Sequence, residues 1–206
     1  MKKLLFTLAL GTLGCQSAPE EAPTRTCTAV VIRHAEAFTN VGQTDGLTDE
    51  QANALTPKGV QQAEDLSDEL KSLGLEVLIS SEIGRAQNTA KVLAEDLGLN
   101  DVIVDARFNM LSRGDDPNPE IGSWDWRVTH WKAGQDRTPP NGESMKDGVE
   151  RVNGALQEYC KAHKRFGVVT HSDVIAGVRA SNAGTSLMTA HESMMIEPAD
   201  FVLLSL

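Results

Sequence analysis

Residues 28–36 read Thr28-Ala-Val-Val-Ile-Arg-His-Ala-Glu36 and indicate the fold class most strongly. The first five residues of this stretch are apolar or β-branched, a composition typical of a short strand that is buried on both faces. The apolar run ends abruptly at Arg33 and His34. Since ligands of parallel α/β sheets bind beyond the carboxyl ends of the strands, the sequence predicts that this strand delivers an arginine and a histidine to a ligand site.

Apolar strands and amphipathic helices alternate along the rest of the chain. The apolar runs predict strands at 77–79, 102–104, 167–170 and 201–204. Helical spacing of apolar residues predicts helices at 57–73, 84–97, 143–163 and 174–181. This alternation, with strands that are apolar throughout, predicts a three-layer α/β/α sandwich around a mostly parallel central sheet.

The segment from 105 to 142 shows no period and is expected to be irregular. It holds four of the eight prolines and all three tryptophans. A long insert inside a compact domain usually carries function or covers a site, so we expect it to set specificity.

The first residues have the pattern of an export signal. Lys2 and Lys3 precede an apolar run that is too short to span a bilayer, and Gly14-Cys15 follows as a cleavage point. A small residue before cysteine resembles a bacterial lipobox, although Thr12 stands where leucine is usual. We expect 1–14 to be a signal peptide and 15–26 a flexible tether, with a lipid anchor at Cys15; cleavage and release without lipid is the alternative.

Composition and cysteine count narrow the setting of the remaining domain, residues 27–206. The formal net charge of −10, without runs of Lys or Arg, excludes the electrostatic footprint of a nucleic-acid-binding protein. If Cys15 carries lipid, Cys27 and Cys160 remain as an even pair, either as a disulfide or as two buried thiols. We expect an exported lipoprotein of the bacterial cell envelope, anchored to the membrane and facing the periplasm.

Polar residues that suit a phosphoryl group follow three of the predicted strands. They are Arg33 and His34 after the first strand, Arg85 shortly after the second, and His171 after the fourth. A guanidinium group binds two phosphate oxygens at once through bidentate hydrogen bonds. A neutral imidazole is a competent nucleophile near neutral pH. This chemistry requires no metal and no cofactor, and the sequence has no metal-ligand spacing of the HExxH type.

Five motifs together resemble the histidine phosphatase superfamily, in its phosphoglycerate-mutase-like branch. They are Arg33-His34-Ala35-Glu36 with Asn40, Leu55-Thr56-Pro-Lys-Gly59, Ser80-Ser81-Glu-Ile-Gly-Arg85, Pro140-Asn-Gly142-Glu143-Ser144 and Thr170-His171-Ser172. Each motif alone is weak, but all five occur in the order of the family and at the expected places on strands and helices.

The resemblance implies a role for each of the residues that carry it. His34 looks like the nucleophile that becomes phosphorylated, and Arg33, Arg85 and His171 look like the phosphate pocket, with Asn40 at its edge. Glu36 is expected to orient the loop through hydrogen bonds. The partner implied is a small phosphorylated substrate.

Two residues depart from the family's pattern. Ala35 replaces the usual glycine, which puts a methyl group next to the pocket. Met110 stands where the family's phosphatases often carry a glutamate as proton donor, and methionine cannot donate a proton. We expect Glu120 to take that role after an insertion, with Asp125 and Glu143 as poorer candidates.

Three functions remain open at this point. The first is a phosphatase that hydrolyses phosphomonoesters through a phosphohistidine, without a metal, outside the cytoplasm. The second is a phosphomutase, which export disfavours because glycolytic phosphate esters are cytosolic. The third is a non-catalytic phosphate-binding module, which Met110 makes conceivable.

Overall fold

A computed structural model describes residues 26–206 of the chain. The expected signal peptide, the tether and the lipid anchor at Cys15 lie outside the described residues. Among the helices of the described part, none is long and apolar enough to cross a membrane.

One sheet in the order β3-β2-β4-β1-β5 forms the centre of the domain. Its strands are β1 (Thr28–Arg33), β2 (Leu78–Ser80), β3 (Val102–Val104), β4 (Arg165–Thr170) and β5 (Phe201–Ser205). β1 pairs in parallel with β4 and antiparallel with β5, and β2 pairs in parallel with both β3 and β4. The carboxyl ends of β1, β2 and β4 therefore lie at the same edge of the sheet.

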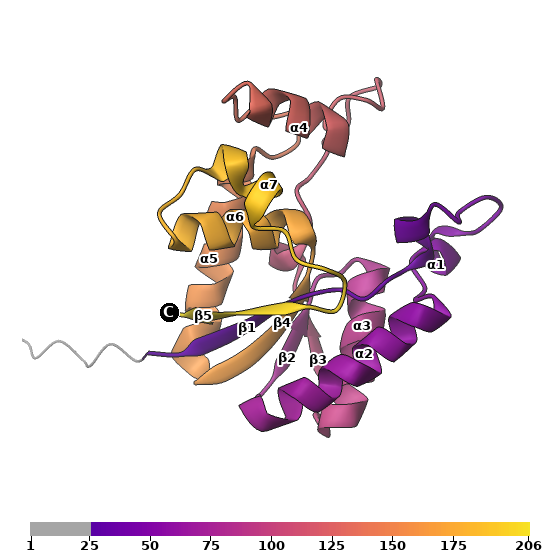
Figure 1. The fold of residues 1–206 in the computed structure, drawn as a ribbon, viewed down its shortest axis with the longest axis vertical. Helices are drawn as coiled ribbons and strands as arrows, with labels where there is room; N and C mark the ends of the chain where they lie inside the picture. The colour runs from indigo at the N-terminus through magenta and orange to yellow at the C-terminus, as the bar shows by residue number, and fades with distance from the viewer. Residues whose placement is uncertain (1–25) are drawn as a thin grey trace, which may run out of the picture.

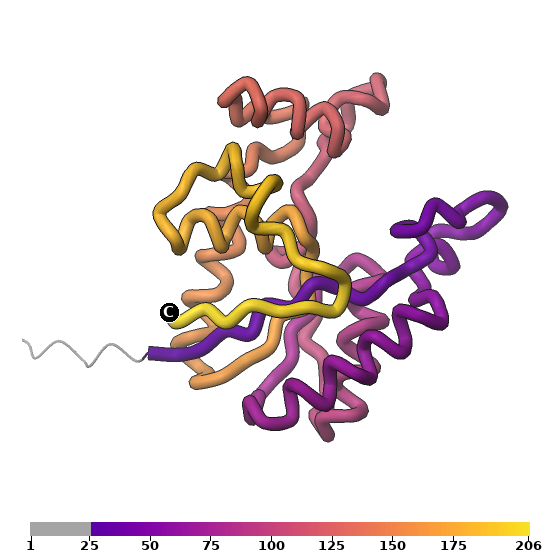
Figure 2. The backbone as a smooth tube through the Cα atoms, in the orientation of Figure 1, coloured from indigo at the N-terminus to yellow at the C-terminus, as the bar shows by residue number. Residues whose placement is uncertain are grey.

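Helices cover both faces of this sheet (Figure 1). The α-helices are α1 (Asp49–Ala52), α2 (Pro57–Leu70), α3 (Gly84–Leu97), α4 (Trp124–Lys132), α5 (Met145–Ala162), α6 (Ser172–Asn182) and α7 (Ala190–Ser193). The 3₁₀ turns are η1 (Phe38–Val41), η2 (Lys71–Leu73), η3 (Ala106–Phe108) and η4 (Leu187–Thr189). α2 and α3 lie on one face, α5 and α6 on the other, and the backbone trace shows the first and last strands side by side (Figure 2).

Alternation along β1 explains the three layers. Ala29 and Val31 pack into a core cluster that includes residues of α5 and α6, whereas Val30 and Ile32 pack into a second cluster with α2 and α3. Because successive side chains of a strand point to opposite faces, an apolar strand buries both faces of the sheet. The predicted three-layer α/β/α sandwich with a mostly parallel sheet is confirmed, and β5 is its antiparallel strand.

Two details differ from the sequence prediction. β3 lies at an edge of the sheet, and Val104 is 50% exposed, so not every apolar strand is buried. The insert is not wholly irregular, since it contains η3 and α4. Ser123 caps α4 by accepting a hydrogen bond from the backbone N of Trp126, and Trp131 is buried in the core. The helix escaped prediction because apolar residues do not line one face of it.

A disulfide joins the beginning of β1 to the end of α5. The sulfur atoms of Cys27 and Cys160 are bonded, and the two cysteines are 133 residues apart in the sequence. Of the two states that the sequence left open for this pair, the structure has the disulfide.

Candidate active site

Three strand ends bring the polar residues that follow them to one place. The backbone N of His34 donates to the carbonyl oxygen of Thr170 at 3.0 Å, so His34 and His171 follow paired positions of β1 and β4. Their imidazole rings lie edge to face with centroids 5.2 Å apart. Arg85, at the beginning of α3, contacts both rings. The predicted convergence of these three residues from distant segments is what the structure has.

His34 is held as a neutral imidazole with a lone pair on Nε2. Its ring is almost fully buried, and Nδ1 lies 2.8 Å from the carbonyl oxygen of Ala35, which can only accept a hydrogen bond. Nε2 accepts a hydrogen bond from Nε of Arg85 at 3.0 Å. Burial, with the nearby charges of Arg85 and Arg33, lowers the pKa of His34 to about 3, although the bond to Ala35 opposes the shift.

Arg85 uses the rest of its guanidinium group on three partners. Nη1 donates to Oδ1 of Asn53 at 2.9 Å, and Nη2 lies 3.3 Å from Nδ1 of His171 and 3.4 Å from the sulfur of Met110. Burial lowers the pKa of Arg85, but an arginine remains charged in a protein. The guanidinium is therefore a fixed cation between the two histidines.

Arg33 contributes a second cation at the end of β1. Its Nη1 donates to the carbonyl oxygen of Ile196 at 2.6 Å, while its buried Nε has no hydrogen-bond partner within residues 26–206. Burial lowers the pKa of Arg33, and the carboxylates of Glu197 and Asp173 oppose the shift. Two fixed guanidinium groups beside two neutral imidazoles form a site that attracts a dianion in an otherwise acidic protein.

The loop after His34 is shaped by contacts with the beginning of α2. The carboxylate of Glu36 accepts hydrogen bonds from Lys58 and from the hydroxyl of Thr56, each at 2.8 Å, and these bonds lower its pKa. Gly59 is required here, because a Cβ would lie 1.9 Å from the carbonyl oxygen of Glu36. The structure thus places Glu36 where it orients the loop.

Asn40 closes the turn that follows the His34 loop. Its Oδ1 accepts a hydrogen bond from the backbone N of Ala37 at 2.8 Å, and the residue is exposed. The side-chain oxygen closes the turn of η1, so Asn40 shapes the loop after His34. Its expected place at the edge of the phosphate pocket stays a prediction.

Glu120, the expected proton donor, is not brought to the histidines. It is exposed and lines a surface hollow together with Asp125, Trp126 and His130. The backbone of Glu120 takes part in the turn that leads into α4, where its carbonyl oxygen accepts from the N of Ser123. The insert folds this turn against its own helix, which is why the expectation fails for Glu120 and for Asp125.

Glu143, the other acid considered, forms an ion pair. Its two carboxylate oxygens accept from Nε and Nη2 of Arg151 at 2.6 and 2.7 Å, and one also accepts from the backbone N of Ser112. Burial raises the pKa of Glu143, but these bonds outweigh it and the pKa is lowered. A carboxyl group held in its ionised form is a poor proton donor.

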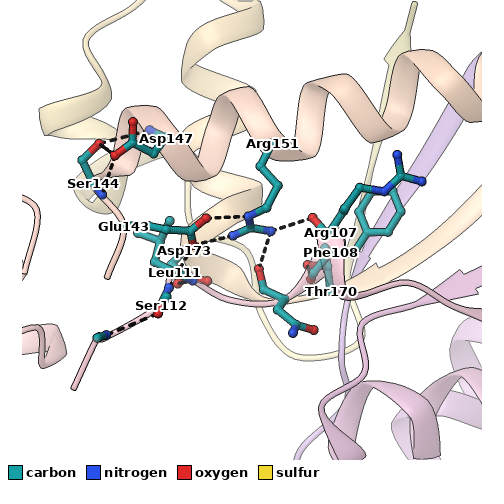
Figure 3. A network of polar contacts seen from close by, with 12 residues as sticks. Arg107, Phe108, Leu111, Ser112, Glu143, Ser144, Asp147, Arg151, Thr170 and Asp173 are labelled. Atoms are coloured by element: carbon teal, nitrogen blue, oxygen red, sulfur yellow. Dashed lines mark hydrogen bonds and ion pairs between the residues drawn. The ribbon is translucent and has the colours of Figure 1, made fainter. Parts of the chain in front are cut away.

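The network around Arg151 fixes the segment 107–112, which passes the site (Figure 3). Nη1 of Arg151 donates to the carbonyl oxygens of Arg107 and Asn109, and the hydroxyl of Thr170 donates to that of Phe108. Asp173 accepts from the backbone N of Leu111 at 2.9 Å. Backbone bonds along this segment therefore determine where its side chains lie.

Sequence reasoning missed three residues that contact the site. Ser81 lies 2.9 Å from Nε2 of His171, Asn109 accepts from Ser81, and Asn53 binds Arg85. Ser81 lies in the third motif and Asn109 directly precedes Met110, but neither position indicates a contact with the site. Asn53 precedes the second motif by two residues and carried no signal of its own.

Comparisons with known proteins agree with this geometry. A family model described as histidine phosphatase superfamily (branch 1) matches residues 29–205. Among curated proteins, the chain is 33% identical over 141 residues to a probable phosphoglycerate mutase, GpmB, of Enterobacter sp. (strain 638), a match that covers 64% of this chain and 62% of that protein. It is 35% identical over 136 residues to the GpmB of Salmonella arizonae, covering 61% and 60%. The chain thus spans about three fifths of the length of these relatives.

Solved structures share the fold at low sequence identity. Bacillus stearothermophilus YhfR has a TM-score of 0.69 at 24% identity, covering 86% of this chain and 90% of that one. A mycobacterial glucosyl-3-phosphoglycerate phosphatase in complex with VO3 has a TM-score of 0.68 at 22% identity, covering 87% and 91%. With the family match over nearly all described residues, the chain belongs to the histidine phosphatase superfamily.

Proposed function

We propose that this protein is a phosphatase that hydrolyses small phosphomonoesters through a phosphohistidine on His34. The observation that carries the proposal is the state of His34: Nδ1 is committed to the carbonyl oxygen of Ala35, and Nε2 keeps its lone pair within 3.0 Å of Arg85. A neutral imidazole with a fixed tautomer, next to cations that bind phosphate, is an activated nucleophile.

The reaction proceeds in two displacements at phosphorus. Nε2 of His34 attacks, the P–N bond forms, and the bond to the leaving oxygen breaks with the electron pair on that oxygen. Arg85 moves its Nε hydrogen bond from His34 to a phosphate oxygen, and Arg33 and His171 contact the other oxygens. The leaving alkoxide takes a proton from solvent. Water then attacks the phosphohistidine, the P–N bond breaks, His34 regains its lone pair, and one proton of the attacking water goes to solvent while the other stays on the phosphate.

A cavity beside the phosphate pocket offers room for the leaving group. It has a volume of about 460 Å³, and its lining includes Ile83, Met110, Leu111 and Arg113. Met110 also contacts Arg85, so this cavity adjoins the nucleophile. Its lining also includes Asn109, Ser112, Glu143 and Arg151, so its walls are partly apolar and partly charged. A cavity of this size and lining favours a substrate that is larger than a bare phosphate group.

We further propose that the protein is exported and anchored through Cys15. The terminal sequence supports this, and so does the Cys27–Cys160 disulfide, because disulfides persist in oxidising compartments. Cell fractionation with metabolic labelling by a fatty acid tests the proposal. Label that is lost in Cys15→Ala is expected, and unlabelled protein in the soluble cytosolic fraction contradicts it.

Export also favours hydrolysis over transfer between glycolytic phosphate esters. The phosphomutase remains the second candidate, supported by the names of the curated relatives. A phosphatase should release inorganic phosphate in proportion to substrate consumed, whereas a mutase should move the phosphoryl group between hydroxyls with little release.

The deciding experiment is hydrolysis of an aryl phosphate by residues 26–206 in the presence of EDTA. We expect turnover that disappears in His34→Ala, and acid-labile, base-stable phosphate on the wild-type protein after rapid quenching. Retained turnover in His34→Ala would refute the mechanism. Phosphate binding without turnover would indicate a non-catalytic module.

A further inference from the structure

Two hydrogen bonds connect the ring of His171, through Ser81, to Asn109 in the segment that carries Met110, and a third fixes the amide of Asn109. Nε2 of His171 lies 2.9 Å from Oγ of Ser81, and this hydroxyl donates to Oδ1 of Asn109 at 2.8 Å. Nδ2 of Asn109 donates in turn to the carboxylate of Glu82 at 2.8 Å. This chain lies on the side of His171 that faces away from Arg85.

The orientation of the Asn109 amide follows from its partners. Oδ1 also accepts from the backbone N of Glu82 at 3.0 Å, which only an oxygen can do, and the group that meets the Glu82 carboxylate must be the donor Nδ2. Since Oδ1 faces Ser81, the single hydroxyl proton of Ser81 is given to Asn109.

This commitment of the Ser81 proton determines the tautomer of His171. With its proton on Asn109, Oγ of Ser81 can only accept, so Nε2 of His171 must carry a hydrogen. The opposite side of the ring agrees, because Nδ1 lies 3.3 Å from Nη2 of Arg85, and an arginine can only donate. Nδ1 is therefore the nitrogen with the lone pair, and it faces the phosphate pocket.

We propose that Asn109 is a positioning residue of the phosphate pocket: through Ser81 it holds a hydrogen on Nε2 of His171 and keeps Nδ1 as the basic nitrogen that meets the phosphate. When a phosphate monoanion enters, Nδ1 takes its proton and becomes a donor to the resulting dianion. Ser81 continues to accept from Nε2, so the imidazolium has a partner on both sides.

The charges that face His171 make this proton transfer depend on the phosphate. Arg85 from α3, Arg33 from β1 and Arg151 from α5 are the cations around the ring, and His34 is the other titratable group beside it. Together with burial they hold the pKa of His171 well below its usual value while the pocket contains no anion. A bound phosphate brings the negative charge that stabilises the imidazolium.

The inference rests on the proposed phosphate pocket, and nitrogen NMR of ¹⁵N-labelled protein tests its geometry without any variant. Without phosphate, Nε2 of His171 is expected to be pyrrole-type and Nδ1 pyridine-type. On saturation with inorganic phosphate, both nitrogens are expected to show the imidazolium signature. The opposite tautomer in the free protein overturns the proposal.

Binding of inorganic phosphate to variants tests the role of Asn109. Asn109→Leu frees the Ser81 hydroxyl to donate to Nε2, and Ser81→Ala removes the acceptor; each is expected to weaken binding about tenfold to a hundredfold. Both substitutions disturb the same hydrogen on Nε2 of His171. The double variant should therefore bind phosphate with about the affinity of whichever single variant binds it less tightly. If the losses of affinity in the two single variants multiply in the double variant, the proposed connection from Asn109 through Ser81 to His171 is overturned.

A matched replacement separates this effect from a general effect of losing an amide. Asn100→Leu changes an exposed residue at the opposite end of the sheet, before β3, and should bind phosphate as the wild type does. Wild-type affinity in Asn109→Leu overturns the inference and leaves the proposed function intact. If the wild type itself binds no phosphate, the proposed function fails. The tautomer of His171 measured by NMR in the free protein then still tests whether Asn109 and Ser81 hold a hydrogen on Nε2.

Discussion

Arg151 holds the segment 107–112 in place, and Arg151→Met removes that hold while keeping most of the side-chain volume. In the native protein its guanidinium bonds both carboxylate oxygens of Glu143 and the carbonyl oxygens of Arg107 and Asn109 (Figure 3). After the substitution, Glu143 keeps only its bond from the backbone N of Ser112. The variant therefore leaves a partly buried carboxylate without its cation.

The cost follows from how deeply the pair is buried. The side chains of Arg151 and Glu143 are 21% and 22% exposed. Breaking a fully buried pair costs about 3–5 kcal/mol, and partial exposure places this pair at the lower end, about 3 kcal/mol. For a domain of this size, that loss lowers the melting temperature by about 6–12 °C.

Glu143→Gln provides the matched comparison, because the amide can still accept from Ser112 and Arg151. The substitution is expected to lower the free energy of unfolding by about 1 kcal/mol, because a hydrogen bond to a charged group is stronger by about that amount than one to a neutral group. In the double variant Arg151→Met with Glu143→Gln no uncompensated charge remains, so it should be more stable than Arg151→Met alone by about 1 kcal/mol.

Urea unfolding followed by circular dichroism measures the stability, and aryl phosphate hydrolysis measures the site. Asn109 and Met110 belong to the segment 107–112, which Arg151 no longer holds in this variant. We therefore expect kcat/KM of Arg151→Met to fall by up to about a hundredfold, even under conditions in which the protein is fully folded. A loss of stability under about 1 kcal/mol, or costs that simply add in the double variant, would refute the reasoning.

Three further predictions concern the site and the domain. Arg85→Ala should lower kcat/KM about tenfold to a hundredfold, because the charge-assisted bond that Arg85 is proposed to donate to phosphate is lost, and Arg85→Lys should recover only part of this in the same assay. Because the pKa of His34 is lowered to about 3, the unfolded chain binds a proton that the folded one does not between pH 6.5 and 3. The contribution of His34 to the free energy of unfolding is therefore fully present above pH 6.5. As the pH falls below that value, this contribution decreases by about 1.4 kcal/mol per pH unit. His34→Gln should show a shallower loss in urea unfolding between pH 6.5 and 5, and an unchanged slope would contradict the lowered pKa. Finally, reduction of Cys27–Cys160 should destabilise the domain by about 2–5 kcal/mol, seen as a lower urea midpoint with dithiothreitol, whereas Cys27→Ser should be insensitive to the reductant.

The fold and the convergence of His34 with His171 could be predicted from the sequence because their signals are local. An apolar run followed at once by Arg33 and His34 marks a strand end, and the same pattern recurs before His171. The parallel pairing of β1 with β4 then brings the two histidines together without further information.

The proton donor and the insert could not be predicted, because they depend on how a nonperiodic segment folds. The position of Glu120 in the insert suggests a proton donor, yet the turn into α4 places it in a hollow beside Trp126. Glu143 is tied to Arg151, a residue with no local signal that it would be needed there. Neither the position of Glu120 nor the ion pair of Glu143 can be predicted from the spacing of residues in the sequence.

The layers of the fold followed from the sequence because periodicity and strand ends act over a few residues. The family followed from five motifs in order along the chain, and the strand ends indicated that Arg33, His34, Arg85 and His171 converge. Only the tertiary structure decided the hydrogen positions that make those residues chemically distinct. Ser81 and His171 are 90 residues apart, and Ser81 and Asn109 are 28 apart. A proton's location depends on which donor and acceptor meet across such distances, and the folded sheet alone brings them together.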